Sequence, residues 1–256
     1  AIAGGDTYLT SGGWLKADGS IVLQSSYATL YGRVGLIGGA FTTWNDRNSA
    51  AGAGATVLDG CAVGPSGQLL AVGASGYIRT STDGGATWTD RNAAAGVSTT
   101  GLNDCAIGPT GEMLALGYAG YIRTSTDGGA TWTDRNAAAG ATTTGLMGCA
   151  IGPSGQMIAV GFNGYIRTST DGGATWTDRN AAAGATTTIL YGTPAIGPSG
   201  EMIAVGASGY IRTSTDGGAT WTDRKAAAGT GGFTMYGSAI GPTGEMLFVG
   251  GNGYIR

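Results

Sequence analysis

The sequence predicts an all-β fold, a five-bladed β-propeller with four strands in each blade. One octapeptide, Ser-Thr-Asp-Gly-Gly-Ala-Thr-Trp, occurs four times without change and recurs after 44, 44 and 45 residues. Each repeat contains four short β-like runs separated by turn residues, which is the pattern of a propeller blade. Glycine contributes 52 residues and charged residues only 11%, so a helical solenoid is disfavoured.

The third repeat shows the expected elements in order. Strands are predicted at Leu146–Ile151, Gln156–Val160, Tyr165–Thr168 and Thr175–Arg179. Turns are predicted between them at 152–155, 162–164 and 171–173, where glycine gathers with proline, asparagine or aspartate. The run Met157–Val160 is apolar on both faces, as expected for a strand that neighbouring sheets cover.

The two ends of the chain complement each other. Full repeats cover 58–101, 102–145, 146–189 and 190–234, whereas a fifth, 235–256, stops after three strands. Residues 36–57, which contain Trp44, match the missing half. Pairing of this N-terminal strand with the C-terminal three would close the ring and cover the sheet edges that an open row exposes. The alternative is a six-bladed ring in which residues 1–35 form another blade.

Three cysteines, Cys61, Cys105 and Cys149, occupy one position of the repeat. Thr193 or Pro194 fills this position in the fourth repeat, and Ser238 fills it in the fifth. An odd number of equivalent small residues predicts buried structural thiols rather than disulfides or a metal site.

Over residues 36–256 the chain resembles the Asp-box (BNR-repeat) propellers, whose motif Ser-x-Asp-x-Gly-x-Thr-Trp the octapeptide fits. The resemblance implies a hairpin between the third and fourth strands, remote from the ligand face. The aspartate can accept hydrogen bonds from its own turn, the glycines can adopt positive φ, and the tryptophan can fill space between blades. A calcium-binding or catalytic role of the aspartates is the alternative. The predicted structural residues are Asp83, Trp88, Asp127, Trp132, Asp171, Trp176, Asp216 and Trp221.

The Asp-box family includes sialidases, which need an arginine cluster, a Tyr/Glu nucleophile pair and an acid/base carboxylate. Here the arginines and glutamates are copies of repeated positions, the chain has no histidine, and we expect no carboxylate near the axis to break the repeat. We therefore expect no catalytic residue, no cofactor and no bound metal. The repeated aspartates and arginines are expected to pair at strand ends, as Asp90 with an arginine of the adjoining strand.

The repeats differ from one another in two loops, between the second and third strands and at the start of the first strand. In a propeller these loops share one face. Aromatic rings there can stack on sugars while amides and hydroxyls bind sugar hydroxyls, and drift in unconstrained loops is the alternative explanation. The candidate ligand-binding residues are Asp59, Asn103, Asp104, Tyr118, Met147, Phe162, Asn163, Tyr191, Tyr236 and Asn252.

Residues 1–35 do not follow the repeat. The segment 13–20, with Trp14 and Asp18, followed by 26–35, resembles the opening segment of the phage tail collar domain, although Ala17 stands where that family has cysteine. A hairpin at Asp18-Gly19 and a short amphipathic helix over Ser25–Val34 are expected. The resemblance implies a virion protein, made in the host cytoplasm, that attaches to other phage tail proteins through this segment.

Composition narrows the choice of partner. The net charge is −3 without a basic cluster, which disfavours nucleic acid as a partner. No run approaches the roughly 18 apolar residues of a membrane helix, and no signal peptide is visible at the start. We expect a non-enzymatic phage tail protein that binds a host cell-surface glycan through repeated pockets, with avidity from several sites and from homo-oligomers. A structural or docking module of the virion without a sugar ligand is the alternative, followed by a sialidase-like glycosidase.

Overall fold

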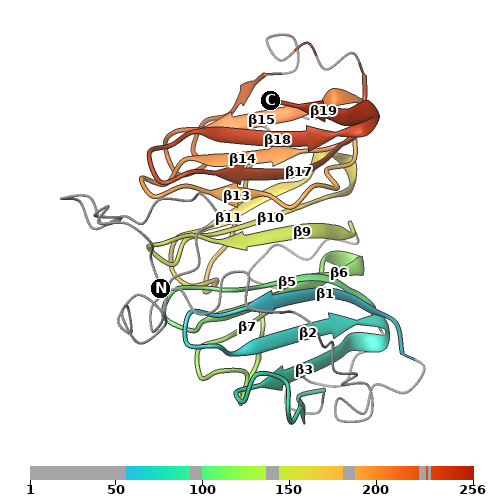
Figure 1. Ribbon diagram of the computed structural model, residues 1–256, viewed down its shortest axis with the longest axis vertical. Coiled ribbons are helices and arrows are strands. Elements are labelled where there is room, and N and C mark those ends of the chain that lie inside the picture. Colours follow the sequence, from blue (N-terminus) through green and yellow to red (C-terminus); the bar gives the residue numbers. More distant parts are fainter. Residues whose placement is uncertain (1–55, 93–99, 137–143, 181–187, 225–228, 230–231) are drawn as a thin grey trace, which may run out of the picture. The chain divides into compact units, whose positions relative to one another are not determined.

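The computed structural model describes residues 56–92, 100–136, 144–180, 188–224, 229 and 232–256, all within the compact unit Arg47–Arg256. The predicted collar-like segment 1–35 lies outside the described residues. So does the predicted half repeat 36–57, apart from Thr56 and Val57. The described residues form five antiparallel sheets, four of them four-stranded and the last three-stranded (Figure 1). The predicted all-β class is confirmed.

Each sheet is a meander in which strands pair in chain order. The first strands are β1 (Leu58–Val63), β5 (Leu102–Ile107), β9 (Leu146–Ile151), β13 (Ala195–Ile196) and β17 (Met235–Ile240). The second strands are β2 (Leu69–Gly73), β6 (Met113–Gly117), β10 (Met157–Gly161), β14 (Met202–Val205) and β18 (Met246–Gly250).

The outer strands are shorter. The third strands are β3 (Tyr77–Ser81), β7 (Ile122–Ser125), β11 (Ile166–Ser169), β15 (Ile211–Ser214) and β19 (Tyr254–Ile255). The fourth strands are β4 (Thr89–Asp90), β8 (Thr133–Asp134), β12 (Thr177–Asp178) and β16 (Thr222–Asp223). In the third repeat, all four predicted strands are present, and only the fourth is markedly shorter than expected.

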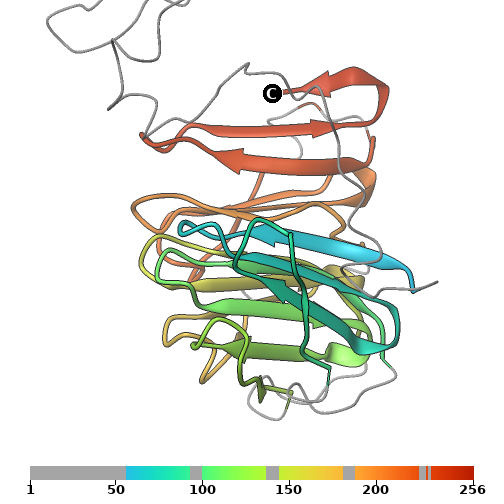
Figure 2. The ribbon, with the colours of Figure 1, turned by 60° about the horizontal axis from the view of Figure 1, so that its bottom comes forward.

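The first strands follow one another through the molecule, β1 beside β5, then β9, β13 and β17 (Figure 1, Figure 2). Strand β13 is reduced to two residues because the fourth repeat has Thr193-Pro194 where the other repeats have a single residue. Proline has no amide hydrogen to donate to a sheet ladder, so regular pairing begins only after it. A parallel bridge from Thr193 to Gly237 instead connects this stretch to the next first strand.

The core lies between successive sheets. We call the side of a sheet that meets the next sheet its front face and the opposite side its rear face. At the junction of the second and third sheets, the front face presents Leu114, Leu116 and Ile122, and the rear face presents Leu146, Met157 and Trp176. The five aliphatic side chains are at most 1% exposed and Trp176 is 8% exposed. Burial of each such aliphatic side chain stabilises the fold by about 1.5–3 kcal/mol.

Equivalent side chains form the other three junctions between described sheets. Trp132 and Trp221 belong to these clusters as Trp176 does, whereas Trp88 of the first sheet is only half-buried. The glycine-rich repeat thus builds its core from one stripe of Leu, Ile, Val and Met on each sheet face.

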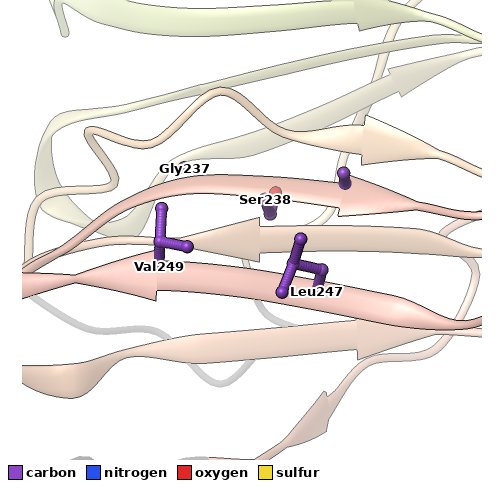
Figure 3. Close-up of a pocket in the computed structure, with 5 residues that line it drawn as sticks. Gly237, Ser238, Leu247 and Val249 are labelled. Atoms are coloured by element: carbon purple, nitrogen blue, oxygen red, sulfur yellow. The ribbon is translucent and has the colours of Figure 1, made fainter. Parts of the chain in front are cut away.

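The two outermost faces of the described sheets are exposed. The front face of the last sheet shows Leu247 at 45% and Ile255 at 69% exposure, and the rear face of the first sheet shows Leu58 at 44%. A hollow of about 210 Å³ lies over this last front face, beside Gly237, Ser238, Leu247 and Val249 (Figure 3).

The burial of the cysteines also depends on whether a neighbouring sheet covers them. All three thiols are free; Cys105 and Cys149 are buried at interior junctions, and Cys61 is exposed. The expectation of three buried thiols is therefore wrong for Cys61. It lies on the rear face of the first sheet, which no described sheet covers.

Candidate ligand-binding face

The two variable loops meet at one end of every sheet. The connection between second and third strands is a short 3₁₀ turn, and its first residue donates its backbone N–H to the carbonyl of the last residue of the preceding repeat. The five bonds are Ala74 to Val57, Tyr118 to Gly101, Phe162 to Gly145, Ala207 to Ile189 and Gly251 to Thr234, at 2.8–3.1 Å. We call this end of the sheets the variable face.

The 3₁₀ turns are η2 (Ala74–Gly76), η3 (Tyr118–Gly120), η4 (Phe162–Gly164), η5 (Ala207–Gly209) and η6 (Gly251–Gly253). The middle residue of each has positive φ, between 54° and 60°. Asparagine tolerates this left-handed conformation better than most residues. Asn163 and Asn252 therefore have a conformational reason to be present, beside any role in binding.

Exposed aromatic side chains gather on the variable face. Tyr118 is 49% exposed, Tyr191 42% and Tyr236 63%. Phe162 is half-buried. Phe233, which our comparison of repeats missed because it precedes the fifth repeat, is 39% exposed and lies with its ring centroid 6.4 Å from that of Tyr254.

Two of these rings come together at Gly145. A Cβ atom placed on this glycine would lie 2.7 Å from Cδ2 of Phe162 and 3.2 Å from Cδ1 of Tyr118. Both rings therefore border the same residue, although they belong to the turns of different sheets. Tyr191 precedes β13, and Tyr236 lies on β17, the first strand of the neighbouring sheet. There a Cβ on Gly192 would lie 3.2 Å from the backbone of Tyr236.

The polar candidates Asn103 and Asp104 bind the protein itself. The Asn103 amide donates to the carbonyl of Leu146 at 2.7 Å and lies 3.5 Å from the sulfur of Met147. The Asp104 carboxylate accepts the backbone N–H of Cys105 and that of Cys149, each at 2.9 Å. The bonds to Leu146 and from Cys149 connect β5 to β9.

Asp104 breaks the repeat, because Gly60, Gly148, Gly192 and Gly237 occupy its position elsewhere. Sequence reasoning named Asp104 as a candidate without noting this departure, although aligning this one position reveals it. The glycines have a steric reason: a Cβ on Gly60 would lie 2.8 Å from Cα of Asp104. Burial raises the pKa of Asp104, and its two backbone hydrogen bonds offset part of that shift.

Asp59 and Asn252 are exposed, and Asn103 and Met147 are half-buried. The structure thus places the candidates on one face but divides them: Asn103 with Met147, Tyr118 with Phe162, and Tyr191 beside Tyr236. It does not bring all ten into one pocket.

The octapeptides lie at the other end of the sheets, and each aspartate is saturated by its own turn. Asp171 accepts hydrogen bonds from the backbone N–H of Thr175 at 2.9 Å, from the Thr175 hydroxyl at 2.6 Å and from the Ser169 hydroxyl at 2.8 Å. Bonds from the threonine, first through its hydroxyl, lower the pKa of Asp171 to about 2. Gly172 and Gly173 have φ of 68° and 83°. Asp83, Asp127 and Asp216 repeat this geometry.

This opposite end also carries an apolar hollow of about 500 Å³ among the turns between first and second strands. Its lining includes Val63, Ile107, Ile151 and Ile196, with the glycines and prolines of three turns. Strand-end ion pairs occur in the sheets as well: Arg79 lies 3.2 Å from Asp90, Arg123 3.8 Å from Asp134 and Arg212 3.6 Å from Asp223.

Within the described part of the chain, no group of three or more Cys, Asp or Glu side chains is placed to hold a metal ion. No helix among the described residues has the length and apolar character needed to cross a membrane.

No protein-family model matches the chain, and no curated protein matches it. Several solved structures do match the chain. A structure of YCF48 bound to D1 peptide aligns with a TM-score of 0.57 and 18% identity, over 78% of this chain and 64% of that one. The GH74 enzyme of Niastella koreensis aligns with a TM-score of 0.56 and 20% identity, over 77% of this chain and 29% of that one.

The chain therefore spans less than two thirds of either protein. At these identities the similarity establishes the fold and nothing of the ligand. Both neighbours are β-propellers with sheets of four antiparallel strands, and this chain has the same sheet architecture.

Proposed function

We propose that this protein is a non-enzymatic carbohydrate-binding module and that it recognises its ligand with the variable face. The observation that carries the proposal is the exposure of aromatic rings at one end of the sheets. Tyr118, Tyr191 and Tyr236 are each more than 40% exposed there. Such rings stack on the C–H faces of sugar rings, while neighbouring amides such as Asn163 and Asn252 can bind sugar hydroxyls.

The chemistry of the carboxylates supports binding without catalysis. Glycoside hydrolysis uses two carboxyl groups that flank an accessible glycosidic bond. The octapeptide aspartates use their oxygens within their own turns, and both oxygens of Asp104 accept backbone N–H groups. None of these carboxylates is free to act as an acid or a nucleophile. Release of reducing ends from a bound polysaccharide, abolished by Asp104→Asn, would contradict this part of the proposal.

The biological setting that we propose is a phage tail, with a host surface glycan as the ligand. This rests on the resemblance of residues 1–35 to the tail collar domain, and it makes that segment the attachment to other tail proteins. Weak sites gain avidity when several chains are displayed on one particle.

A glycan array of bacterial surface polysaccharides, followed by calorimetric titration, tests the binding function. We expect binding that Tyr118→Ala weakens. The matched control is Val63→Ala, which removes exposed apolar surface (71% exposed) at the opposite end of the sheets and leaves binding unchanged. An equal loss of glycan binding in both variants, or no binding to any glycan on the array, would contradict a carbohydrate site on the variable face.

Docking of another tail protein is the second candidate function. The observation that favours it is the exposed apolar surface away from the variable face, on the last sheet at Leu247 and Ile255. Binding of a tail protein that Leu247→Asp abolishes, together with silence on the glycan array, would select this function.

A further inference from the structure

The junction between the second and third sheets is distinguished by two residues of the variable face. The first residue of the 3₁₀ turn and the last residue of the preceding repeat vary together along the chain. An aromatic residue in the turn accompanies glycine, and a small residue in the turn accompanies a larger partner. The pairs are Tyr118 with Gly101, Phe162 with Gly145, Ala74 with Val57, Ala207 with Ile189 and Gly251 with Thr234.

Glycine is needed at position 145 because the Phe162 ring occupies the space of a side chain, whereas at Gly101 a Cβ would make an ordinary contact with the Tyr118 ring. A Cβ on Gly101 would touch Cδ2 of Tyr118 at 3.4 Å, and one on Gly145 would clash with Phe162 at 2.7 Å. Each ring therefore lies over the glycine that ends the preceding repeat, which we call its glycine seat. A Cβ on Gly145 would also lie 3.2 Å from Cδ1 of Tyr118, so both rings border this glycine at the junction.

The strands beneath the rings are held together by bonds from two adjacent residues, one at a variable position and one that departs from the glycine of the other repeats. Asn103 donates to the carbonyl of Leu146, and Asp104 accepts the N–H of Cys149. Both bonds cross from β5 to β9. A ring pair on strands that are tied together loses little freedom when a ligand binds, and this preorganisation favours affinity.

The groups around the rings define the chemistry of the ligand. The neighbouring side chains are Asn163, which is exposed, and Met147 and Asn103, which are half-buried; none of them is charged. The carboxylate of Asp104 is turned to backbone amides. A pair of rings without adjacent charge suits two consecutive neutral pyranose units, whose C–H faces stack on aromatic rings.

We propose that the protein has one principal sugar site, at the junction of the second and third sheets, where Tyr118 and Phe162 form a stacking platform for a neutral oligosaccharide. The inference rests on the proposed function and replaces the sequence-based expectation of equivalent repeated pockets. The rival location is the junction of the fourth and fifth sheets, where Tyr191 and Tyr236 are exposed but have no glycine seat of this kind.

Calorimetric titration with neutral hexasaccharides (cello-, malto- and mannohexaose) tests the location through stoichiometry. We expect one site per chain, and a loss of affinity of about tenfold or more in Tyr118→Ala and in Phe162→Ala. Gly145→Val, which places a side chain in the space of the Phe162 ring and displaces the ring, should also abolish binding. Thermal unfolding establishes that each variant folds. The control is Val63→Ala, at the opposite end of the sheets, which should bind as the parent does, and Tyr236→Ala tests the rival location.

A variant that gains a second sugar site provides a test that does not depend on loss of binding, which misfolding could also cause. Ile189→Gly with Ala207→Tyr recreates the seat and the second ring beside Phe162, and we expect the stoichiometry to rise from one to two. Three or more sites in the parent, or loss in Tyr236→Ala alone, would overturn the location. Binding confined to charged sugars would overturn the ligand class, and no binding to any glycan would instead overturn the proposed function on which it rests.

Discussion

The interior junctions and the outermost sheet faces carry apolar residues at the same positions of the repeat. The junctions are buried core, whereas the outermost faces are exposed surface. Leu114, Ile158, Ile203 and Leu247 occupy one position of the repeat; the first three are fully buried and Leu247 is 45% exposed. The repeat therefore determines which face of a sheet is apolar, and the neighbouring sheet determines whether that face is buried. A hydrophobic stripe therefore predicts which side chains can be buried, and the presence of a neighbouring sheet decides whether they are.

The largest expected effect is the difference between two identical substitutions on these faces. Leu114→Ala leaves a cavity between sheets and should lower the free energy of unfolding by about 2–5 kcal/mol. Leu247→Ala removes a half-exposed side chain and should cost less than about 1 kcal/mol. Urea unfolding of both variants measures the difference. A cost at Leu247 as large as at Leu114 would mean that the last front face is covered in solution, as closure of the ring requires.

A smaller effect is expected where first strands approach each other. A Cβ on Gly192 would lie 2.3 Å from Cγ2 of Val205 and 3.2 Å from the backbone of Tyr236, whereas one on Gly237 would meet only Val249, at 3.4 Å. Gly192→Ala should cost about 1–3 kcal/mol through overpacking, and Gly237→Ala should remain within about 0.5 kcal/mol. Thermal unfolding compares the pair. Equal costs would show that a further strand lies against Gly237 as β17 lies against Gly192.

The sequence predicted the features that every repeat shares. The 44-residue period and the apolar run Met157–Val160 located the strands, and the turn glycines located their ends. The variable face followed from the antiparallel order of the strands, which sends alternate loops to the same end. These are local properties, and they do not depend on what a given sheet packs against.

The features that sequence reasoning missed depend on contacts between repeats. Asp104 is visible as the one departure from glycine, but its bond to Cys149 requires that β9 lie beside β5. The glycine seats of Tyr118 and Phe162 were readable as paired changes, although only the structure shows that both rings meet at Gly145. The exposure of Cys61 reflects the missing neighbour of a terminal sheet, which the identity of the residue does not reveal.

The octapeptide hairpin provides the opposite case, since its hydrogen bonds are nearly the same in the first sheet and in the third. We expect Asp83→Asn and Asp171→Asn to lower the melting temperature by similar amounts, unlike the two leucine variants. Asp59→Asn, which changes an exposed carboxylate outside the hairpins, is the control and should have no effect. Unequal losses for Asp83 and Asp171 would show that the neighbouring sheet also stabilises the hairpin.

The same aspartates predict a pH dependence. Hydrogen bonds from threonine lower the pKa of Asp83 and of Asp171 from 3.8 to about 2 in the folded protein. A carboxyl group whose folded pKa is depressed contributes stability above its unfolded pKa and loses it as the pH falls through the folded value. The melting temperature should therefore drop between pH 4 and pH 2, with a smaller drop in the Asp→Asn variants. An identical drop in parent and variants would assign it to other groups.

The smallest expected effect concerns the missing fourth strand of the last sheet. Arg79, Arg123 and Arg212 pair with aspartates of their fourth strands, and the register of the repeat predicts Asp46, which lies outside the described residues, as the partner of Arg256. Arg256→Glu and Asp46→Lys should each destabilise slightly and the double variant should recover, because an exposed ion pair contributes little. A double-mutant cycle read by urea unfolding measures this coupling. Coupling together with a large cost of Leu247→Ala would support the five-bladed closure. A large cost of Leu247→Ala without coupling would favour a further blade from the N-terminal residues, because the last face would then be covered by something other than the predicted half repeat.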